Sequence, residues 1–175
     1  MTHEHHEPGR ICYRAAVMVA STKGAVGQRE DTAGPMLAER LTKAGYKVET
    51  VTVVTDDRTA ITECIRDWID KDGVDLVITC GGTGLSPNDV TPEATRDLIE
   101  RDIPGLAEAI RAAGRAKTPH ADLSRGLSGL RKDSLIINLP GSPKGSMEGL
   151  ETVLPALGHA LDKAKGDPRD CAATT

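Results

Sequence analysis

The sequence predicts an α/β fold with three layers (αβα), in which helices cover both faces of a mostly parallel central sheet. Strand-like and helix-like segments alternate along most of the 175 residues, which is typical of β-α-β units. The strand-like runs 74–79 and 135–139 are mostly apolar, as expected for strands buried on both faces. Clusters of Gly, Ser, Asp and Pro follow the strand-like runs, where open parallel sheets bind their ligands.

The first predicted unit is a strand followed by a helix. The apolar run 15–20 is long enough for a buried strand. After a polar segment, Asp31 and Thr32 are candidate N-caps and Pro35 suits a first helical turn. An apolar stripe with helical spacing follows, and Gly45 is a fitting stop; the stripe consists of Met36, Leu37, Leu41 and Ala44.

The second and third units repeat this order. The range 46–55 is rich in Val and Thr and alternates as a strand does. Either Asp56 or Asp57 then caps a helix that ends at Gly73, and its apolar positions are Ile61, Cys64, Ile65, Trp68 and Ile69. The run 74–79 is the next strand.

The second half contains three more helices and one more clear strand. Thr91 is read as a helix cap, with Pro92 and Glu93 in the first turn, and Pro104 opens another helix. The strand at 135–139 precedes a long amphipathic helix over about 147–165, while 118–129 fits either an irregular loop or a hairpin.

Composition excludes several classes of function. Hydrophobic residues make up 38% and charged residues 27%, as in folded globular proteins, while aromatics are only 2%. So few aromatics and a net charge of −4 argue against a nucleic-acid partner. No apolar run approaches a membrane span or a signal peptide. The cysteines form no CxxC pair, which favours a reducing cytoplasm; they are Cys12, Cys64, Cys80 and Cys171.

The chain is expected to form one domain between two flexible ends. Residues 1–14 are predicted to be a polar leader, and the role of its histidines His3, His5 and His6 is open. Residues 15–165 form the predicted domain, and 166–175 are a small, polar tail.

The most informative segment, residues 81–89, follows the third strand and is called the glycine loop below. Its glycines allow backbone amides to approach an anion closely, and its hydroxyls add donors; the candidate ligands of a phosphate are Gly81, Gly82, Thr83, Gly84 and Ser86. Asp89 adds a carboxylate, so phosphate with Mg²⁺ would suit the site. A tight structural turn in which Asp89 is only a cap fits the spacing equally well.

A second turn of this kind follows the strand at 135–139. Prolines restrict its backbone and Gly141 exposes amides, and Lys144 is long enough to reach a phosphate; the candidate binding residues are Pro140, Gly141, Ser142 and Lys144. A plain strand-to-helix connection is the alternative. Ser124 lacks the GxSxG elbow of a hydrolase nucleophile.

Taken together, these segments resemble the MogA/MoaB family of molybdopterin-handling proteins, whose adenylyltransferase members are similar to the gephyrin G domain. The resemblance runs from about residue 15 to residue 165. It rests on the order and spacing of CGGTG (80–84), DVTPEAT (89–95), PG (104–105), LSR (123–125) and LPGSP (139–143).

The resemblance implies a MogA/MoaB-like fold and a set of site residues. The family's catalytic, metal-binding carboxylates correspond to Asp56 and Asp89, and a functional serine corresponds to Ser124. Ser21 follows the first strand as in the family, but Thr22 stands where an aspartate is common, and Cys80 replaces a common hydroxyl residue. These two departures leave the catalytic carboxylates in place.

The implied reaction is transfer of AMP from Mg-ATP to the phosphate of molybdopterin, with release of pyrophosphate. The resemblance also implies a homotrimer or hexamer and a molybdate-inserting protein that receives the product. Three alternatives remain open: a paralogue that binds molybdopterin without catalysis, a trimeric scaffold domain, and a generic nucleotide-binding domain.

Overall fold

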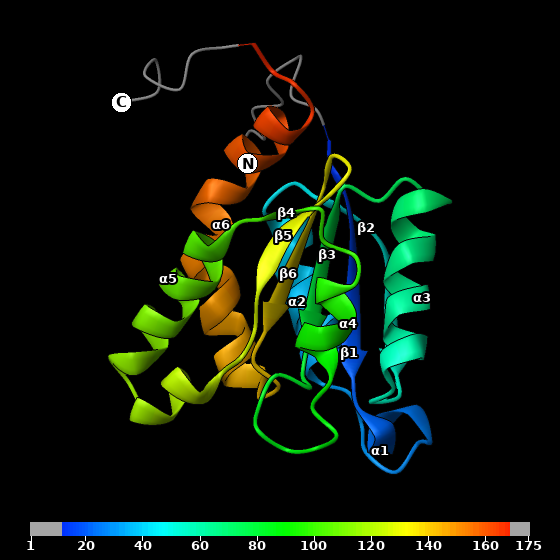
Figure 1. The fold of residues 1–175 in the computed structure, drawn as a ribbon, viewed down its shortest axis with the longest axis vertical. Helices are drawn as coiled ribbons and strands as arrows, with labels where there is room; N and C mark the ends of the chain where they lie inside the picture. Colours follow the sequence, from blue (N-terminus) through cyan, green and yellow to red (C-terminus); the bar gives the residue numbers. More distant parts are fainter. Residues whose placement is uncertain (1–11, 169–175) are drawn as a thin grey trace, which may run out of the picture.

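The computed structural model describes residues 12–168, and it forms a sheet flanked by helices (Figure 1). The strands are β1 Arg14–Ala20, β2 Lys47–Val54, β3 Leu76–Cys80, β4 Arg101–Asp102, β5 Ser128–Arg131 and β6 Ser134–Leu139. The helices are α1 Thr22–Ala25, α2 Ala33–Lys43, α3 Arg58–Asp70, α4 Thr91–Arg96, α5 Pro104–Arg115, the 3₁₀ helix η1 Pro119–Leu123 and α6 Pro143–Ala164.

The sheet is mostly parallel, as the sequence predicts. Its strand order is β2-β1-β3-β6-β5-β4. The four strands β2, β1, β3 and β6 pair in parallel, whereas β5 pairs antiparallel with both β6 and β4. The ambiguous segment 118–129 therefore contains η1 and a loop and then enters a β5–β6 hairpin, so both expectations for it hold in part.

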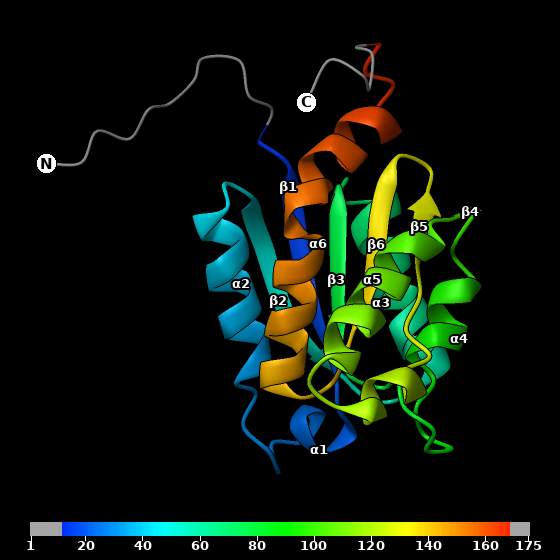
Figure 2. The same ribbon diagram turned by 90° about the vertical axis from the view of Figure 1, so that its left-hand side faces the viewer.

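Two apolar cores lie on opposite faces of the sheet and explain the three layers. One core joins alternate residues of β1, β3 and β6 to α2, α5 and α6, and it includes Val17, Ile78 and Leu157. The other joins the intervening strand residues to α3 and α4, and it includes Met18 and Ile65. Figure 2 shows α2, α5 and α6 in front of the sheet.

Several helix boundaries differ from the prediction. Thr91 is not the cap of α4: Val90 holds that position, and Thr91 is buried without a cap hydrogen bond. The last helix begins at Pro143 rather than near 147, because the Ser142 side chain accepts a hydrogen bond from Gly145 N and caps it. The short helix α1 was not expected. Ser21 is its N-cap, because the Ser21 Oγ accepts a hydrogen bond from Gly24 N.

The folded body begins slightly before the predicted boundary at 15. Arg14 is part of β1, and its backbone N–H donates to Asp75. The buried Tyr13 hydroxyl donates to Asp162 near the end of α6. Residues 1–11 of the predicted leader, which include its histidines, lie outside the described residues, as does most of the tail.

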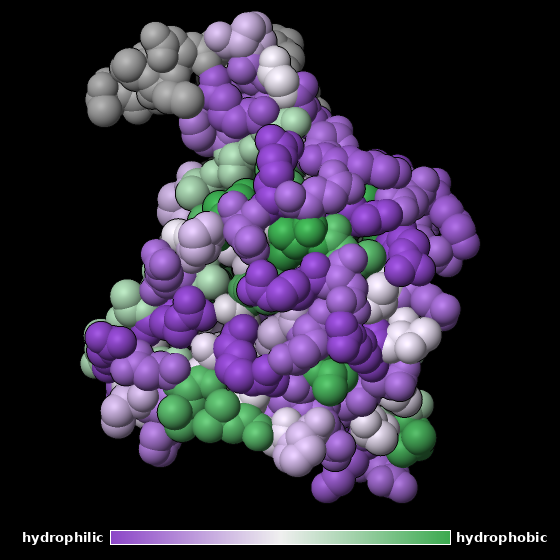
Figure 3. Space-filling model, viewed as in Figure 1, coloured by the Kyte–Doolittle hydropathy of each residue, from purple (hydrophilic) through white to green (hydrophobic). Residues whose placement is uncertain are grey.

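The face seen in Figure 3 is largely hydrophilic, with small apolar patches. Among residues 12–168, four large hydrophobic side chains are exposed, namely Val26, Val51, Leu85 and Leu123. Within residues 12–168, none of the helices combines the length and apolar character that a bilayer span requires.

Candidate functional site

Two cavities lie where the parallel strands end, at the lower edge of the sheet in Figure 1. Each has a volume of about 800 Å³, which is in the usual range for small-molecule sites. Both are lined by the glycine loop and by the turn after β6. Four residues border both cavities, namely Gly82, Asp89, Gly141 and Ser142. A ligand in one cavity can therefore meet a ligand in the other along this shared rim.

The first cavity is rich in charged side chains. It brings together both predicted carboxylates, the predicted Ser21 and most of the glycine loop, since its lining includes Ser21, Asp56, Gly81, Gly82, Ser86 and Asp89. Its lining also includes the basic residues Lys23 and Arg29. The sequence prediction missed both, because they lie in a polar segment without a recognisable spacing.

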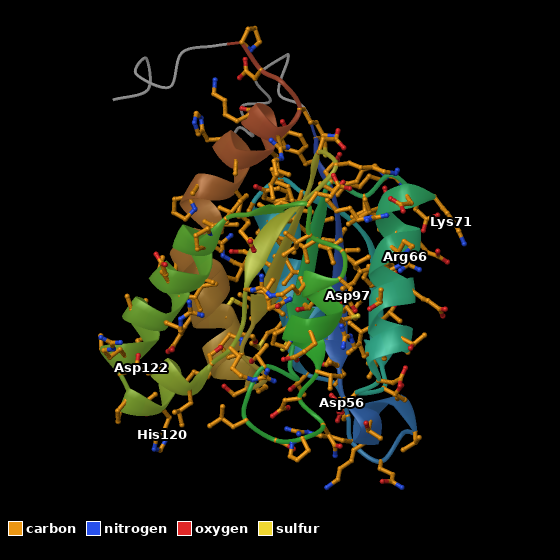
Figure 4. The ribbon with its side chains drawn as sticks, viewed as in Figure 1. Asp56, Arg66, Lys71, Asp97, His120 and Asp122 are labelled. Atoms are coloured by element: carbon orange, nitrogen blue, oxygen red, sulfur yellow. The ribbon has the colours of Figure 1, made fainter. Side chains whose placement is uncertain are left out.

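Asp56 and Asp57 are adjacent in sequence but have different tasks. Asp57 caps α3 by accepting a hydrogen bond from Ala60 N. Asp56 accepts through Oδ2 from Thr22 N at 2.7 Å and from Thr22 Oγ1 at 2.8 Å. The Thr22 hydroxyl in turn accepts from Asp56 N at 3.1 Å, so Asp56 is held against the start of α1 (Figure 4).

Asp89 is held in a similar way by its own loop. Its Oδ2 accepts from Ser86 N at 2.9 Å, and its backbone N–H donates to Ser86 O at 2.9 Å. Asp89 is thus a cap of the turn 86–89, as the structural alternative expected, and it also lines both cavities. Within residues 12–168, no protein donor contacts Oδ1 of Asp56 or of Asp89.

The glycine loop approaches the rest of the site too closely for side chains. Gly81 has φ +96°, and an added Cβ would lie 2.6 Å from the carbonyl oxygen of Ala20. Gly82 has φ +64°, and its Cβ would lie 2.3 Å from Oγ1 of the buried Thr91. Both positions therefore require glycine, because the positive φ and the close approach to Ala20 and Thr91 leave no room for a side chain.

The second cavity has a more apolar lining and contains the predicted serine. Its lining includes Thr83, Gly84, Ser124 and Pro140, together with the apolar side chains of Ile110, Leu123 and Met147. Arg111 and Lys117 add positive charge. Arg111 donates to the carbonyl oxygen of Gly126 at 2.8 Å, which fixes the backbone beside Ser124.

One predicted binding residue lies elsewhere. Lys144 is exposed on the first turn of α6 and is not part of the lining of either cavity. The prolines at 140 and 143 and the Ser142 cap set the direction of this turn. Lys23, Arg29, Arg111 and Lys117 are the basic side chains that the fold brings to the cavities instead.

Cys80, which ends β3, is a buried wall of the first cavity. Its thiol donates to the carbonyl oxygen of Pro140 at 3.2 Å. Burial raises the pKa of the Cys80 thiol to about 11. The neutral thiol therefore joins the glycine loop to the turn after β6, and it is not a poised nucleophile.

The part of the chain that the structure describes offers few ligands for a metal ion. Among the described residues, no three His, Cys, Asp or Glu side chains are grouped to hold one. A divalent ion between Asp56 and Asp89 would have to complete its shell with water and substrate oxygens. This arrangement suits Mg²⁺, which is commonly held by one or two carboxylates together with phosphates.

Comparison with known proteins places these features in a family context. Residues 16–159 match the family described as "Probable molybdopterin binding domain". The chain is 37% identical to molybdopterin adenylyltransferase of Helicobacter pylori strain J99, over 86% of this chain and 87% of that protein.

Two further similarities have different coverage. The chain is 39% identical to the molybdenum cofactor synthesis protein cinnamon of Drosophila melanogaster over 75% of its length, but it spans only 22% of that relative. It also resembles the crystal structure of the molybdopterin biosynthesis enzyme MoaB from Thermus thermophilus, with 47% identity and a TM-score of 0.84, covering 90% of this chain and 99% of that one.

Proposed function

The chain belongs to the molybdopterin-binding domain family of molybdenum cofactor biosynthesis, and from this premise we propose that it is a molybdopterin adenylyltransferase. It transfers AMP from ATP to the phosphate of molybdopterin and releases pyrophosphate. The observation that carries the proposal is the pair of cavities that meet at Gly82, Asp89, Gly141 and Ser142, because the reaction needs two substrates whose phosphates touch.

The two cavities suit the two substrates differently. ATP takes the first cavity. Its lining holds the basic Lys23 and Arg29, but also Glu30 and Asp31 in addition to the two site carboxylates, so the charge of the polyphosphate is offset there only together with a divalent cation. Molybdopterin takes the second, where Ile110 and Met147 contact its ring system and Ser124 binds it. This assignment directs both sets of phosphates to the shared rim.

The chemistry requires alignment more than a strong base. An oxygen of the molybdopterin phosphate attacks the α-phosphorus of ATP, a new P–O bond forms, and the bond to the β-phosphate breaks as pyrophosphate leaves. A phosphate monoester has its second pKa near ~6, so it is largely dianionic at neutral pH. The backbone amides of the glycine loop, together with the basic side chains, offset the negative charge of the two reacting groups.

Asp56 and Asp89 are the residues that would hold Mg²⁺. Each is fixed through Oδ2 by a neighbouring backbone N–H, which leaves the other oxygen for a cation. When bound, the ion neutralises the polyphosphate beside the two carboxylates. Without it, two unit charges ~4 Å apart at an effective dielectric of ~20 repel by about 4 kcal/mol.

The decisive experiment is incubation of the protein with molybdopterin and Mg-ATP, with detection of adenylylated pterin and pyrophosphate. Asp89→Asn keeps an acceptor for Ser86 N–H but removes the charge, so we expect a folded protein with roughly 100-fold lower turnover. Asp56→Asn should behave alike. Asp72→Asn, at an exposed position distant from both cavities, is the matched control.

Titrations with a chelator test whether the metal serves the ATP site and not the molybdopterin site. Chelator should weaken ATP binding strongly and molybdopterin binding little, because amides donate without a metal. Equal weakening of both would refute the assignment of the carboxylates to the nucleotide. Binding of molybdopterin without any adenylylation would identify a binding paralogue instead.

The proposal also covers the oligomeric state, the cellular compartment and the protein that receives the product. We propose a homotrimer, with a hexamer as the larger alternative, that acts in the cytoplasm and passes its product to a molybdate-inserting protein. A stable monomer at micromolar concentration in light scattering would contradict the trimer.

A further inference from the structure

Arg125 makes an unusual set of contacts with the glycine loop. It follows Ser124, and its backbone N–H donates to the carbonyl oxygen of Thr83 at 2.8 Å. Its guanidinium donates through Nε to the carbonyl oxygen of Gly84 at 2.7 Å and through Nη2 to the carbonyl oxygen of Asp89. A single residue thus binds the loop at three points.

These contacts join the two ends of the turn 84–89, whose interior is held by the hydrogen bonds between Ser86 and Asp89. Residues 85–88 are exposed, and no helix or strand covers the range 81–90. The two guanidinium contacts hold the carbonyls of Gly84 and Asp89 to one rigid group, so the turn between them is closed. The carboxylate of Asp89, held by Ser86 N–H within this turn, is therefore placed by a residue 36 positions later in the chain.

We propose that Arg125 is a positioning residue for the adenylyl transfer proposed above, which it serves by fixing Asp89 at the rim shared by the two cavities. Arg125 is not part of the lining of either cavity, so it acts through the loop and not on a substrate. Arg125 directly follows Ser124, which lines the second cavity, and its guanidinium donates to the carbonyl oxygen of Asp89. The same residue therefore fixes the backbone at both substrate sites.

The choice of arginine follows from the geometry. A guanidinium is a planar fork that donates in several directions at once, whereas a lysine ammonium is a flexible point charge. The remaining edge of the fork, Nη1, pairs with Glu93 on α4. Partial burial raises the pKa of Glu93, but the hydrogen bonds from Arg125 and from a backbone N–H, together with the positive charges of Arg125 and Arg58, outweigh this effect, and the net shift is downward.

The first test measures the loop directly by hydrogen–deuterium exchange. Arg125→Lys keeps the charge opposite Glu93 but cannot hold both carbonyls, so amides in 84–91 should exchange faster than in the native chain. Arg101→Lys is the matched control, because Arg101 is exposed and donates to a single carbonyl, that of Lys132. Unchanged exchange in 84–91 of Arg125→Lys would overturn the proposal.

The second test measures the consequence for the site. Arg125→Lys should weaken Mg²⁺-dependent ATP binding and lower turnover by about 10- to 100-fold, as expected when the support of a ligand-holding group is lost. Glu93→Gln leaves both carbonyl contacts in place and removes only the part-buried ion pair with Arg125, so ATP affinity and turnover should fall by less than about fivefold, in line with the modest value of most ion pairs. If Arg125→Lys exchanged faster in the loop but kept native ATP affinity and turnover, the role of Arg125 would be refuted. The same holds if Glu93→Gln lost as much ATP affinity and turnover as Arg125→Lys.

These readouts separate two kinds of failure. If the native chain forms no adenylylated pterin, the proposed function fails. Loop exchange and Mg²⁺-dependent ATP binding still decide whether Arg125 positions Asp89.

Discussion

Replacing Gly81 with alanine tests whether the glycine loop needs its glycines for backbone reasons. The added Cβ would lie 2.6 Å from the backbone oxygen of Ala20, and φ at this position is +96°. A left-handed conformation costs an L-residue about 1–2 kcal/mol, and overpacking costs about 1–3 kcal/mol. Restriction of the unfolded chain returns only about 0.4–1 kcal/mol.

The midpoints of these ranges give a net loss of about 3 kcal/mol, and the extremes give about 1 and 5 kcal/mol. For a chain of this length, each kcal/mol shifts the melting temperature by about 2–4 °C. We expect Gly81→Ala to lower the melting temperature by about 5–15 °C in scanning calorimetry.

Gly158→Ala is the matched control. Gly158 lies inside α6, and no atom lies within 4 Å of an added Cβ. The same substitution should stabilise the protein here by up to about 1 kcal/mol, because alanine is the better helix former. If both variants shift the melting temperature in the same direction, the account of the loop is wrong.

Three further predictions concern individual side chains. Thr22→Val removes the hydroxyl that binds Asp56, so half-maximal turnover should need a higher Mg²⁺ concentration. Thr22→Ser keeps a hydroxyl and should stay close to native. A native Mg²⁺ dependence in Thr22→Val would argue against a role of Thr22 in holding Asp56. Hydrogen bonds from Arg131 and then Lys132 lower the pKa of Asp70 from 3.8 to about 2, so these contacts stabilise the fold above about pH 4 and are lost as the pH falls toward 2. The urea midpoints of native protein and Asp70→Asn should therefore differ most at neutral pH and converge near pH 2, and a constant difference would exclude this titration as the cause. Cys80, with its pKa raised to about 11 by burial, should resist iodoacetamide at pH 8 until the protein is unfolded, as peptide mass spectrometry can show; rapid labelling of the native protein would indicate that the wall of the first cavity opens.

Local sequence was sufficient for the architecture because its signals are short-range. Apolar runs and helical stripes depend on residues within about one or two turns of one another. The runs 74–79 and 135–139 are indeed central strands, and Pro104 opens α5 as predicted. The expected position of the site, after the ends of the strands, came from the same reasoning, since parallel strands direct their carboxyl ends to one edge.

Local rules failed where two candidates compete for one position. Both Asp56 and Asp57 suit an N-cap, and the structure assigns the cap to Asp57 because Asp56 is bound by Thr22, 34 residues earlier. Thr91 resembles a cap in sequence, yet it is buried beneath Gly82 and Val90 takes the cap position.

The sequence by itself determined the α/β class, the order of the four parallel strands and the main helices, and the two loops that carry the candidate site. Only the tertiary structure decided which charged side chains reach the cavities, including Lys23 and Arg111 but not Lys144. It alone brought Arg125 to the glycine loop. The physical reason is that helix and strand formation depend on near neighbours, whereas the direction of a long side chain depends on carbonyls and carboxylates supplied by distant segments.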